Sequence, residues 1–133
     1  MGKLESKICL DTDFLINFLR KKWAEVNFIK ENENNCILAT THINLFELFY
    51  GAYKSGRIED IIAVELLKDR LVTLELNDEA VRVSGEIAAR LDKIGKKIDF
   101  RDLFIGVICV INGFILKTYN VSDFSKIHGL KIN

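Results

Sequence analysis

Residues 7–13 read KICLDTD, a short apolar run that ends in two aspartates. Ile8, Cys9 and Leu10 have the composition of a buried β-strand. Asp11 and Thr12 follow at once, and both are favoured residues at the start of a helix. A strand that passes directly into a helix is the first half of a βαβ unit, so this stretch predicts an α/β fold with a parallel sheet.

The same pattern is repeated along the chain. Apolar, β-prone runs lie at 36–40, 71–74 and 114–118 and near Lys131, which brings the expected strands to five. Stretches with helical periodicity separate them, so we predict a mostly parallel five-stranded sheet flanked by helices. The expected helices run from Asp11 or Thr12 through Phe18, from Thr41 through Tyr53, from Asn77 or Asp78 to Lys93 before Gly95, and over the apolar stretch after Asp102.

Length and composition indicate one domain spanning residues 1–133. The chain is 49% hydrophobic, enough for one core, and it contains no repeat or linker. Its three cysteines are odd in number and lack metal-binding spacing, which fits a reducing cytoplasm. Residues 1–6 lack the apolar segment of an export signal, and the apolar stretch 103–116 is too short to span a bilayer. We therefore expect a cytoplasmic protein without membrane contact.

The balance of charge excludes a general attraction for polyanions. The chain has 19 basic and 19 acidic residues, so its formal net charge is zero. Any contact with nucleic acid must therefore be local. Two basic clusters are candidates, although solvated surface charge explains them equally well: one at 20–22, and one made by Arg90, Lys93, Lys96, Lys97 and Arg101.

Acidic residues follow the expected strands at the edge where their carboxyl ends meet. Loops at that edge of a parallel sheet form one crevice, so side chains from separate strands can converge there. Asp11 and Asp13 follow the first strand, although capping also explains Asp11. Asp99 and Asp102 precede the apolar helix; Asp99 fits a cap, while Asp102 lies at the end of the face that should be buried.

Glu47 is difficult to explain as a surface residue. Ile43 and Gly51, four residues away on either side, make its helix face largely apolar. The chain has no lysine or arginine between His42 and Lys54, so we expect a cation from outside the protein to neutralise Glu47. The alternative is a glutamate at the margin of an apolar stripe that reaches water.

Polar residues also follow the expected strand at 114–118. Thr118, Asn120 and Asp123 would lie at the mouth of the crevice, although turn formation alone accounts for Asn120 and Asp123. Together with Asp11, Glu47 and Asp102, they make a predicted site drawn from several strands.

Four motifs, in this order, resemble the PIN-domain family and in particular VapC-type proteins. They are LDTDFLI at 10–16, INLFELFYGA at 43–52, DLFIG at 102–106, and TYN at 118–120 with DF at 123–124. The acidic positions of the family map onto Asp11, Glu47 and Asp102. Its fourth position, often acidic, is Asn120 here, with Asp123 as a nearby alternative. Thr118 matches the polar residue that precedes it.

This resemblance implies a three-layer α/β/α fold and a metal-dependent endoribonuclease that cuts RNA. Such proteins are usually homodimers held inactive by an antitoxin protein. Mg²⁺, or Mn²⁺ as a substitute, suits a site built from oxygen ligands. Asp11, Glu47 and Asp102 would be ligands, with Asp123 as a further candidate. Asn120 and Thr118 would orient water or phosphate.

Other functions fit less well. Asp11 and Asp13 also resemble the start of a haloacid-dehalogenase-type phosphatase, but Leu15 and the unused Glu47 argue against it. A receiver domain needs an aspartate after its third strand, where this chain has Glu75. A cysteine nucleophile lacks a partner. A catalytically idle PIN-like module remains open, because a fold does not guarantee its chemistry. For the aromatic residues of 46–53, core packing is preferred over dimer contacts.

Overall fold

The computed structural model describes residues 6–133; residues 1–5, which bear on the expected lack of an export signal, lie outside them. Within that range the sheet contains β1 (Ser6–Leu10), β2 (Cys36–Thr41), β3 (Val72–Leu74) and β4 (Ile115–Lys117). Their order is β3-β2-β1-β4, and all neighbours are parallel. Because β1 lies between β2 and β4, the residue that follows it occupies an inner position on the carboxyl edge.

The prediction of a fifth strand near Lys131 is wrong for the described residues. Only an isolated parallel bridge joins Ile132 to Leu116, with Leu116 N donating to Lys131 O at 2.9 Å. Gly129, with φ of 85°, turns the chain just before this point. The segment therefore reaches the β4 edge for too few residues to form a strand ladder.

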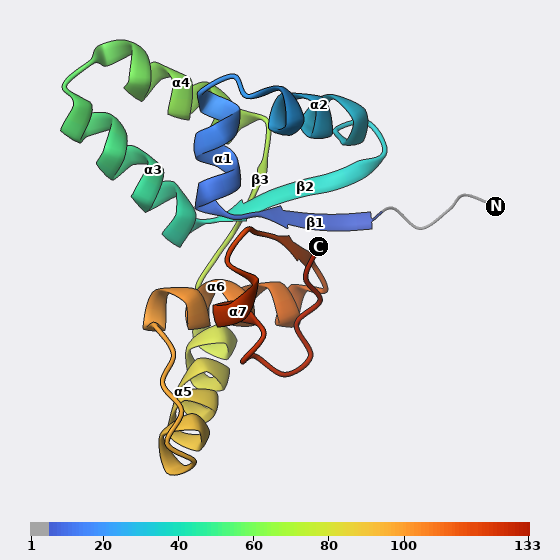
Figure 1. Ribbon diagram of the computed structural model, residues 1–133, viewed down its shortest axis with the longest axis vertical. Helices are drawn as coiled ribbons and strands as arrows, with labels where there is room; N and C mark the ends of the chain where they lie inside the picture. The colour runs from blue at the N-terminus through green and yellow to red at the C-terminus, as the bar shows by residue number, and fades with distance from the viewer. Residues whose placement is uncertain (1–5) are drawn as a thin grey trace.

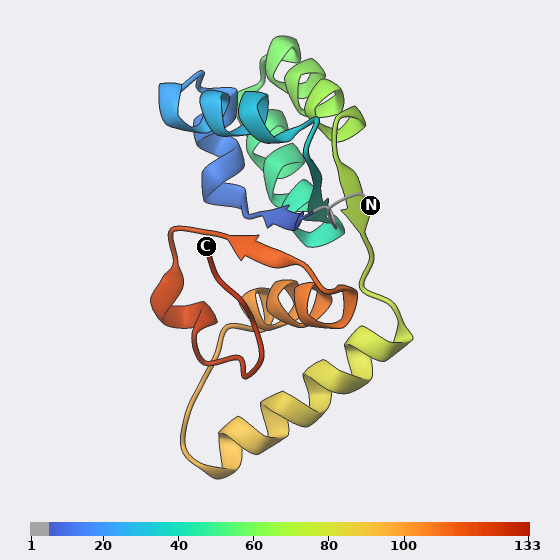
Figure 2. The same ribbon diagram turned by 90° about the vertical axis from the view of Figure 1, so that its right-hand side faces the viewer.

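Helices cover both faces of the sheet (Figures 1 and 2). The first layer contains α1 (Thr12–Leu19), α2 (Trp23–Asn32), α3 (His42–Ser55) and α4 (Ile58–Asp69). The second contains α5 (Asp78–Lys93), α6 (Phe100–Asn112) and the short α7 (Val121–Phe124). The predicted three-layer α/β/α arrangement is confirmed. None of the helices in residues 6–133 is long and apolar enough to cross a membrane.

Two hydrophobic cores, one on each face of the sheet, follow from the alternation of side chains along β1. Ile8 and Leu10 point into the core beneath α1 to α4. Cys9 points to the opposite face, where it packs with Leu116 and with α6 residues such as Val107. A strand buried on both faces has a continuous apolar sequence, which is why residues 8–10 are apolar without alternation.

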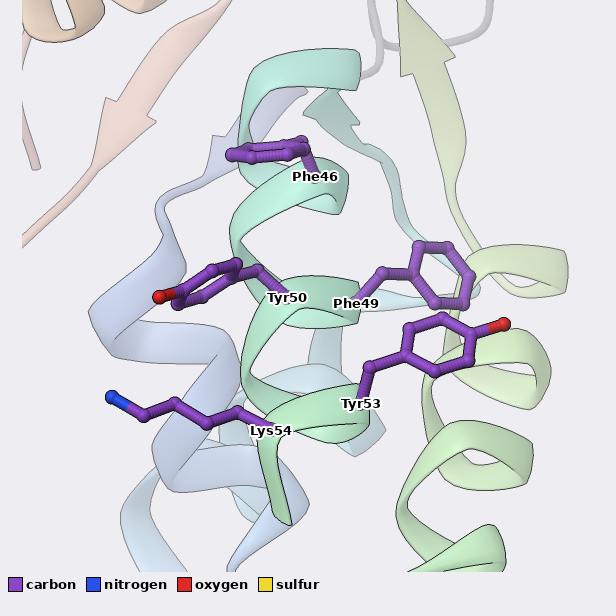
Figure 3. A pocket seen from close by; sticks show the side chains of 5 residues that line it. All are labelled: Phe46, Phe49, Tyr50, Tyr53 and Lys54. Carbon is purple, nitrogen blue, oxygen red and sulfur yellow. The ribbon is translucent and has the colours of Figure 1, made fainter. Parts of the chain in front are cut away.

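Of the aromatic residues at 46–53 in α3, Phe49 packs against the core beneath α1 to α4, as predicted, but the core interpretation is wrong for the other three. Phe46, Tyr50 and Tyr53 are between 60% and 68% exposed. Together with Phe49 and Lys54 they line a shallow surface pocket (Figure 3). Helix α3 is buried instead through Leu45, Leu48 and other residues of its opposite face. We call the five lining residues the α3 aromatic surface.

Candidate active site

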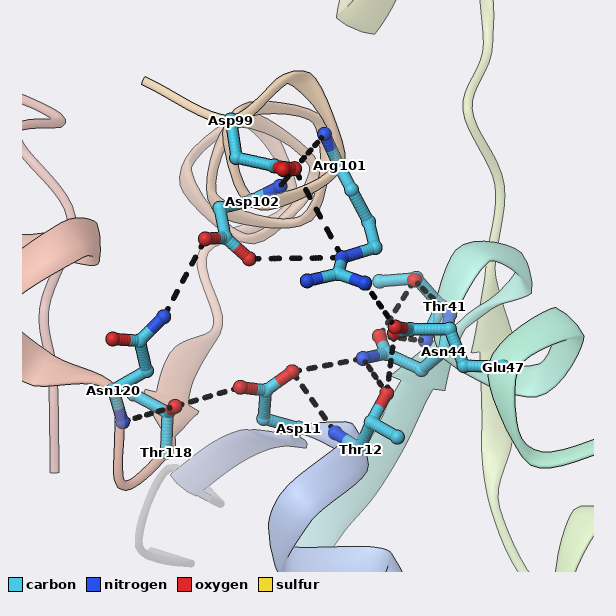
Figure 4. A network of polar contacts seen from close by, with 10 residues as sticks. All are labelled: Asp11, Thr12, Thr41, Asn44, Glu47, Asp99, Arg101, Asp102, Thr118 and Asn120. Atoms are coloured by element: carbon cyan, nitrogen blue, oxygen red, sulfur yellow. Dashed lines mark hydrogen bonds and ion pairs between the residues drawn. The ribbon is translucent and has the colours of Figure 1, made fainter. Parts of the chain in front are cut away.

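The site is assembled at the carboxyl edge of the sheet (Figure 4). Asp11 follows β1, Thr41 ends β2 and Thr118 follows β4. The amino-terminal turn of α6 faces this edge and brings Asp102 to it. The predicted convergence of side chains from separate strands is therefore what the structure contains.

Asp11 is held by three hydrogen-bond donors. It is 7% exposed, and its Oδ1 accepts from the backbone N of Thr12 at 2.9 Å and from Asn44 Nδ2 at 2.9 Å. Its Oδ2 accepts from Thr118 Oγ1 at 2.6 Å. The bond to Thr12 confirms the capping role. The other two bonds fix the carboxylate within the crevice, because a buried charge must find polar partners.

A chain of hydrogen bonds connects Asp11 to Asp102. Thr118 Oγ1, which donates to Asp11, accepts from the backbone N of Asn120 at 3.0 Å. The side-chain amide of Asn120 then donates from Nδ2 to Asp102 Oδ2 at 3.4 Å. Asn120, Thr118, Asp11 and Asp102 thus form one network, as predicted from the sequence.

Asp102 is buried in the first turn of α6, with 6% of its surface exposed. Burial raises its pKa to about 6, the nearby Arg101 guanidinium opposes this shift, and the carboxylates of Asp99 and Asp11 add to it. Asp99 caps α6, accepting from the backbone N of Arg101 at 2.8 Å. The sequence-based distinction between a capping Asp99 and a buried Asp102 is confirmed.

Glu47 joins the same network, but its cation comes from within the protein. Its Oε1 accepts from Thr12 Oγ1 at 2.7 Å, and its Oε2 lies 2.7 Å from Arg101 Nη1. We expected a cation from outside the protein because no basic residue lies between His42 and Lys54, but the structure pairs Glu47 with Arg101. Arg101 lies on α6, far from Glu47 in the sequence, so a search for basic residues three or four positions from Glu47 on its own helix does not find it.

Asp123 lies outside this network. It is in the first turn of α7, its side chain is 48% exposed, and its Oδ1 lies 3.7 Å from Lys126 Nζ. Its charge still contributes to the raised pKa of Asp102. Of the two candidates for the fourth position, Asn120 is the one that contacts Asp102.

The predicted carboxylates also contact three polar residues that were not themselves predicted as site residues: Thr12, Asn44 and Arg101. Asn44 is fully buried and donates to Asp11 Oδ1 and to Thr12 Oγ1, each at 2.9 Å. It also completes a capping box with Thr41 at the start of α3. The Thr41-x-x-Asn44 spacing was the available signal, since a capping box requires a polar residue at that position.

The loop that carries Thr118 and Asn120 is fastened from its other side by Tyr119. The Tyr119 hydroxyl donates to Glu25 on α2, and its backbone N donates to Asp13 Oδ2 at 3.3 Å. The bond from Tyr119 lowers the pKa of Glu25, so this carboxylate stays charged and accepting. Burial and this bond raise the pKa of Tyr119 to about 12, so the hydroxyl remains a donor.

Comparison with known proteins places these residues in a family. The model described as "PIN domain" matches residues 8–130. The chain belongs to the PIN-domain family. Ribonuclease VapC2 of Haemophilus influenzae is 32% identical over 126 residues, covering 94% of this PIN domain and 95% of the relative. The tRNA(fMet)-specific endonuclease VapC of Shigella flexneri is 31% identical over 126 residues, covering 94% and 95%.

A solved structure agrees with the fold of this PIN domain. VapBC-1 from nontypeable Haemophilus influenzae superposes with a TM-score of 0.80 at 31% identity, and the match covers 95% of this PIN domain and 96% of that chain. Among residues 6–133, no three histidine, cysteine, aspartate or glutamate side chains are grouped closely enough to hold a metal ion. The acidic side chains of the PIN-domain site are instead bridged by Thr118, Asn120 and Arg101.

Proposed function

We propose that this PIN domain is a metal-dependent endoribonuclease that hydrolyses RNA phosphodiester bonds in the cytoplasm. Its relatives carry the names ribonuclease and tRNA(fMet)-specific endonuclease. The observation that carries the proposal is the buried pair Asp11 and Asp102, drawn from separate elements and connected through Thr118 and Asn120. Two buried carboxylates at one crevice are costly for stability alone, which supports a functional reason for them.

The chemistry of the donor atoms, rather than their present spacing, supports Mg²⁺ or Mn²⁺, since within residues 6–133 no three acidic, histidine or cysteine side chains are close enough together to hold an ion. Burial is the main cause of the raised pKa of Asp102, and the nearby carboxylates of Asp99 and Asp11 raise it further, so a divalent cation would relieve both the cost of burial and the repulsion. Hard cations prefer oxygen ligands, which Asp11, Asp102 and Glu47 provide. When bound, such an ion would lower the pKa of the attacking water and stabilise the negative charge on the leaving oxygen.

The remaining residues would position the reactants. Thr118 and Asn44 fix the orientation of the Asp11 carboxylate. The Asn120 side-chain amide, partly buried beside Asp102, would orient water or a phosphate oxygen. These contacts do not read bases, so the RNA sequence must be selected elsewhere on the surface.

We further propose that the chain is the toxin of a toxin–antitoxin pair and forms a homodimer. The resemblance to VapC-type proteins and the likeness to VapBC-1 support a protein partner. The α3 aromatic surface supports it as well, since exposed apolar patches of this kind often mark interfaces. Light scattering of the purified chain tests the homodimer, and a monomer at micromolar concentration would contradict it.

Cleavage by the Asp102→Asn variant tests the enzymatic proposal. Asparagine keeps the volume of the side chain while removing its charge, so cleavage should collapse and folding should survive. Wild type and variant are incubated with structured and single-stranded RNA in Mg²⁺, Mn²⁺ or EDTA. The expected result is cutting by wild type alone, abolished by EDTA. Normal cutting by Asp102→Asn would contradict the site.

A catalytically idle PIN-like module that binds RNA or protein is the second candidate. The ion pair between Glu47 and Arg101 favours it, because Glu47 is already neutralised within the protein. Titration with Mn²⁺ separates the two candidates. The idle module should bind Mn²⁺ poorly or bind RNA without cutting it, whereas the nuclease should bind Mn²⁺ through Asp11 and Asp102.

A further inference from the structure

Arg101 brings a guanidinium group into a network otherwise built from carboxylates, hydroxyls and amides (Figure 4). Its Nη1 lies 2.7 Å from Glu47 Oε2. Its Nε lies 3.9 Å from Asp99 Oδ1 and 4.0 Å from Asp102 Oδ1. Glu47 provides the closest contact by more than an ångström, so the guanidinium is primarily the partner of Glu47.

The pair is placed at the boundary between the buried site and the solvent. The Arg101 side chain is 53% exposed, whereas that of Glu47 is 19% and that of Asp102 is 8% exposed. Arginine is charged at every accessible pH, so the positive partner of Glu47 is always present. The other Glu47 oxygen is bonded to Thr12, which leaves the carboxylate little freedom to turn toward Asp11 and Asp102.

We propose that Arg101 is a built-in counter-ion that competes with a divalent cation for Glu47 and thereby sets the metal affinity of the site. The proposal rests on the metal-dependent function argued above. Glu47 can serve as a metal ligand only by giving up its contact with Arg101. The free energy of that contact is then subtracted from the free energy of metal binding, because binding one partner excludes the other.

Mn²⁺ affinity measured without RNA tests this role directly. Isothermal titration gives the Mn²⁺ dissociation constant of wild type and of Arg101→Gln, and near-UV circular dichroism verifies that both are folded. We expect Arg101→Gln to bind Mn²⁺ at least roughly fivefold more tightly, the lower range of coupling between linked sites. Arg90→Gln is the matched control, because Arg90 pairs with Glu86 on the exposed surface of α5 and should leave the affinity unchanged.

A double-mutant cycle separates competition from a general electrostatic effect. Removing any positive charge near the site could strengthen cation binding through its field alone. In the Glu47→Gln background Arg101 has lost its closest carboxylate and keeps only the longer contacts with Asp99 and Asp102, so Arg101→Gln should then change the Mn²⁺ affinity much less. The proposal would be overturned if Arg101→Gln increased the Mn²⁺ affinity equally in the wild-type and the Glu47→Gln backgrounds. It would also be overturned if wild type and Arg101→Gln bound Mn²⁺ with equal affinity.

The outcomes also distinguish this proposal from the proposed function. If wild type cuts RNA with Mn²⁺ while Arg101→Gln binds the ion no more tightly, the competition is disproved and the nuclease stands. If none of the four proteins binds Mn²⁺ and none cuts RNA, the metal-dependent function fails and the competition fails with it.

Discussion

Thr118 Oγ1 lies 2.6 Å from Asp11 Oδ2, although the two residues are 107 positions apart in the sequence. The contact exists because β4 pairs in parallel with β1, with Leu10 opposite Lys117. The residues that follow both strands therefore emerge side by side. Segments far apart in the sequence are thereby joined at the centre of the site.

Thr118→Val should weaken both folding and cleavage. Valine has the same shape but no hydroxyl, so Asp11 loses a donor and the backbone N of Asn120 loses its acceptor. We expect a loss of about 1–3 kcal/mol in the free energy of unfolding, since buried polar groups are left unpaired. Cleavage should fall roughly 10- to 100-fold, as for other residues that orient ligands. Urea unfolding and RNA cleavage measure the two effects.

Thr73→Val is the matched control for this substitution. Thr73 lies on β3 and is not fully buried. Its replacement should change the unfolding free energy by less than about 0.5 kcal/mol, as is usual at such positions. If both variants behaved alike, the hydroxyl of Thr118 would have no special role.

Asp102 should make the metal-free protein less stable as the pH rises. Its pKa is raised from 3.8 to about 6, so the folded state binds the proton more strongly than the unfolded chain. The stability that Asp102 contributes is fully present at pH values below its pKa in the unfolded chain. It is lost as the pH rises through about 6, the pKa of Asp102 in the folded state. In EDTA at pH 7.5, Asp102→Asn should therefore be more stable than wild type, by up to roughly 3 kcal/mol.

Urea unfolding of both proteins between pH 4 and 7.5 measures this difference. Other carboxyl groups titrate in both proteins, so the difference between them isolates Asp102. It should be small near pH 4 and grow toward pH 7. A constant difference, or a wild type that is the more stable protein at pH 7.5, would contradict the raised pKa.

Tyr119→Phe should loosen the loop that carries Thr118 and Asn120. The ring, which packs against Phe14, is retained, but the hydroxyl that bonds to Glu25 is lost. Glu25 is only 5% exposed and would keep Asn17 as its remaining side-chain partner. We expect the unfolding free energy to fall by about 1–3 kcal/mol.

Cleavage by Tyr119→Phe should fall together with stability, because the loop no longer holds Asn120 firmly against Asp102. Tyr53→Phe is the control, since Tyr53 is 66% exposed and lies on the α3 aromatic surface. A Tyr119→Phe protein as stable and active as Tyr53→Phe would show that the bond to Glu25 has no positioning role.

Gly106 and Gly85 should respond to alanine with opposite signs. A Cβ at Gly106 would lie 2.2 Å from Ile127 Cδ1, whereas one at Gly85 meets no atom within 4 Å. Gly85→Ala should raise the unfolding free energy by about 1 kcal/mol through helix propensity. Gly106→Ala should lower it, because overpacking a core costs about 1–3 kcal/mol.

Shortening Ile127 tests the cause of the Gly106 effect. Valine lacks the Cδ1 atom with which the new methyl group collides. The double variant Gly106→Ala/Ile127→Val should therefore be more stable than the sum of the two single changes predicts. If the changes in unfolding free energy were strictly additive, the destabilisation by Gly106→Ala would come from a contact other than that with Ile127 Cδ1.

Much of the site could be predicted because it depends on where strands end. Asp11, Asp102, Thr118 and Asn120 each lie directly after a strand or at the start of a helix, positions that are visible in the sequence. The role of Arg101 could not be predicted, because its contact with Glu47 depends on how α6 sits over α3. A local window around Glu47 contains no information about that placement.

The helices α2 and α4 were not predicted, for a physical reason that differs between them. Helix α2 buries few residues, and one of them is the charged Glu25, whose partner Tyr119 lies far along the chain. Helix α4 buries Val64 and Leu67 but exposes other large apolar residues, which obscures the periodicity of its buried face. The aromatic residues of α3 were misassigned for a similar reason. Helical spacing of apolar residues does not show which face of the helix packs against the rest of the protein.

The long sequence separation between Asp11 and Thr118 has a consequence during synthesis. Strand β1 leaves the ribosome before its partner β4, which is made more than a hundred residues later. A nascent chain can pair β1 with β2 early, but Asp11 acquires its Thr118 partner only after β4 has emerged. Until then the nascent chain carries an incomplete site, because the Asp11 carboxylate lacks one of its three donors.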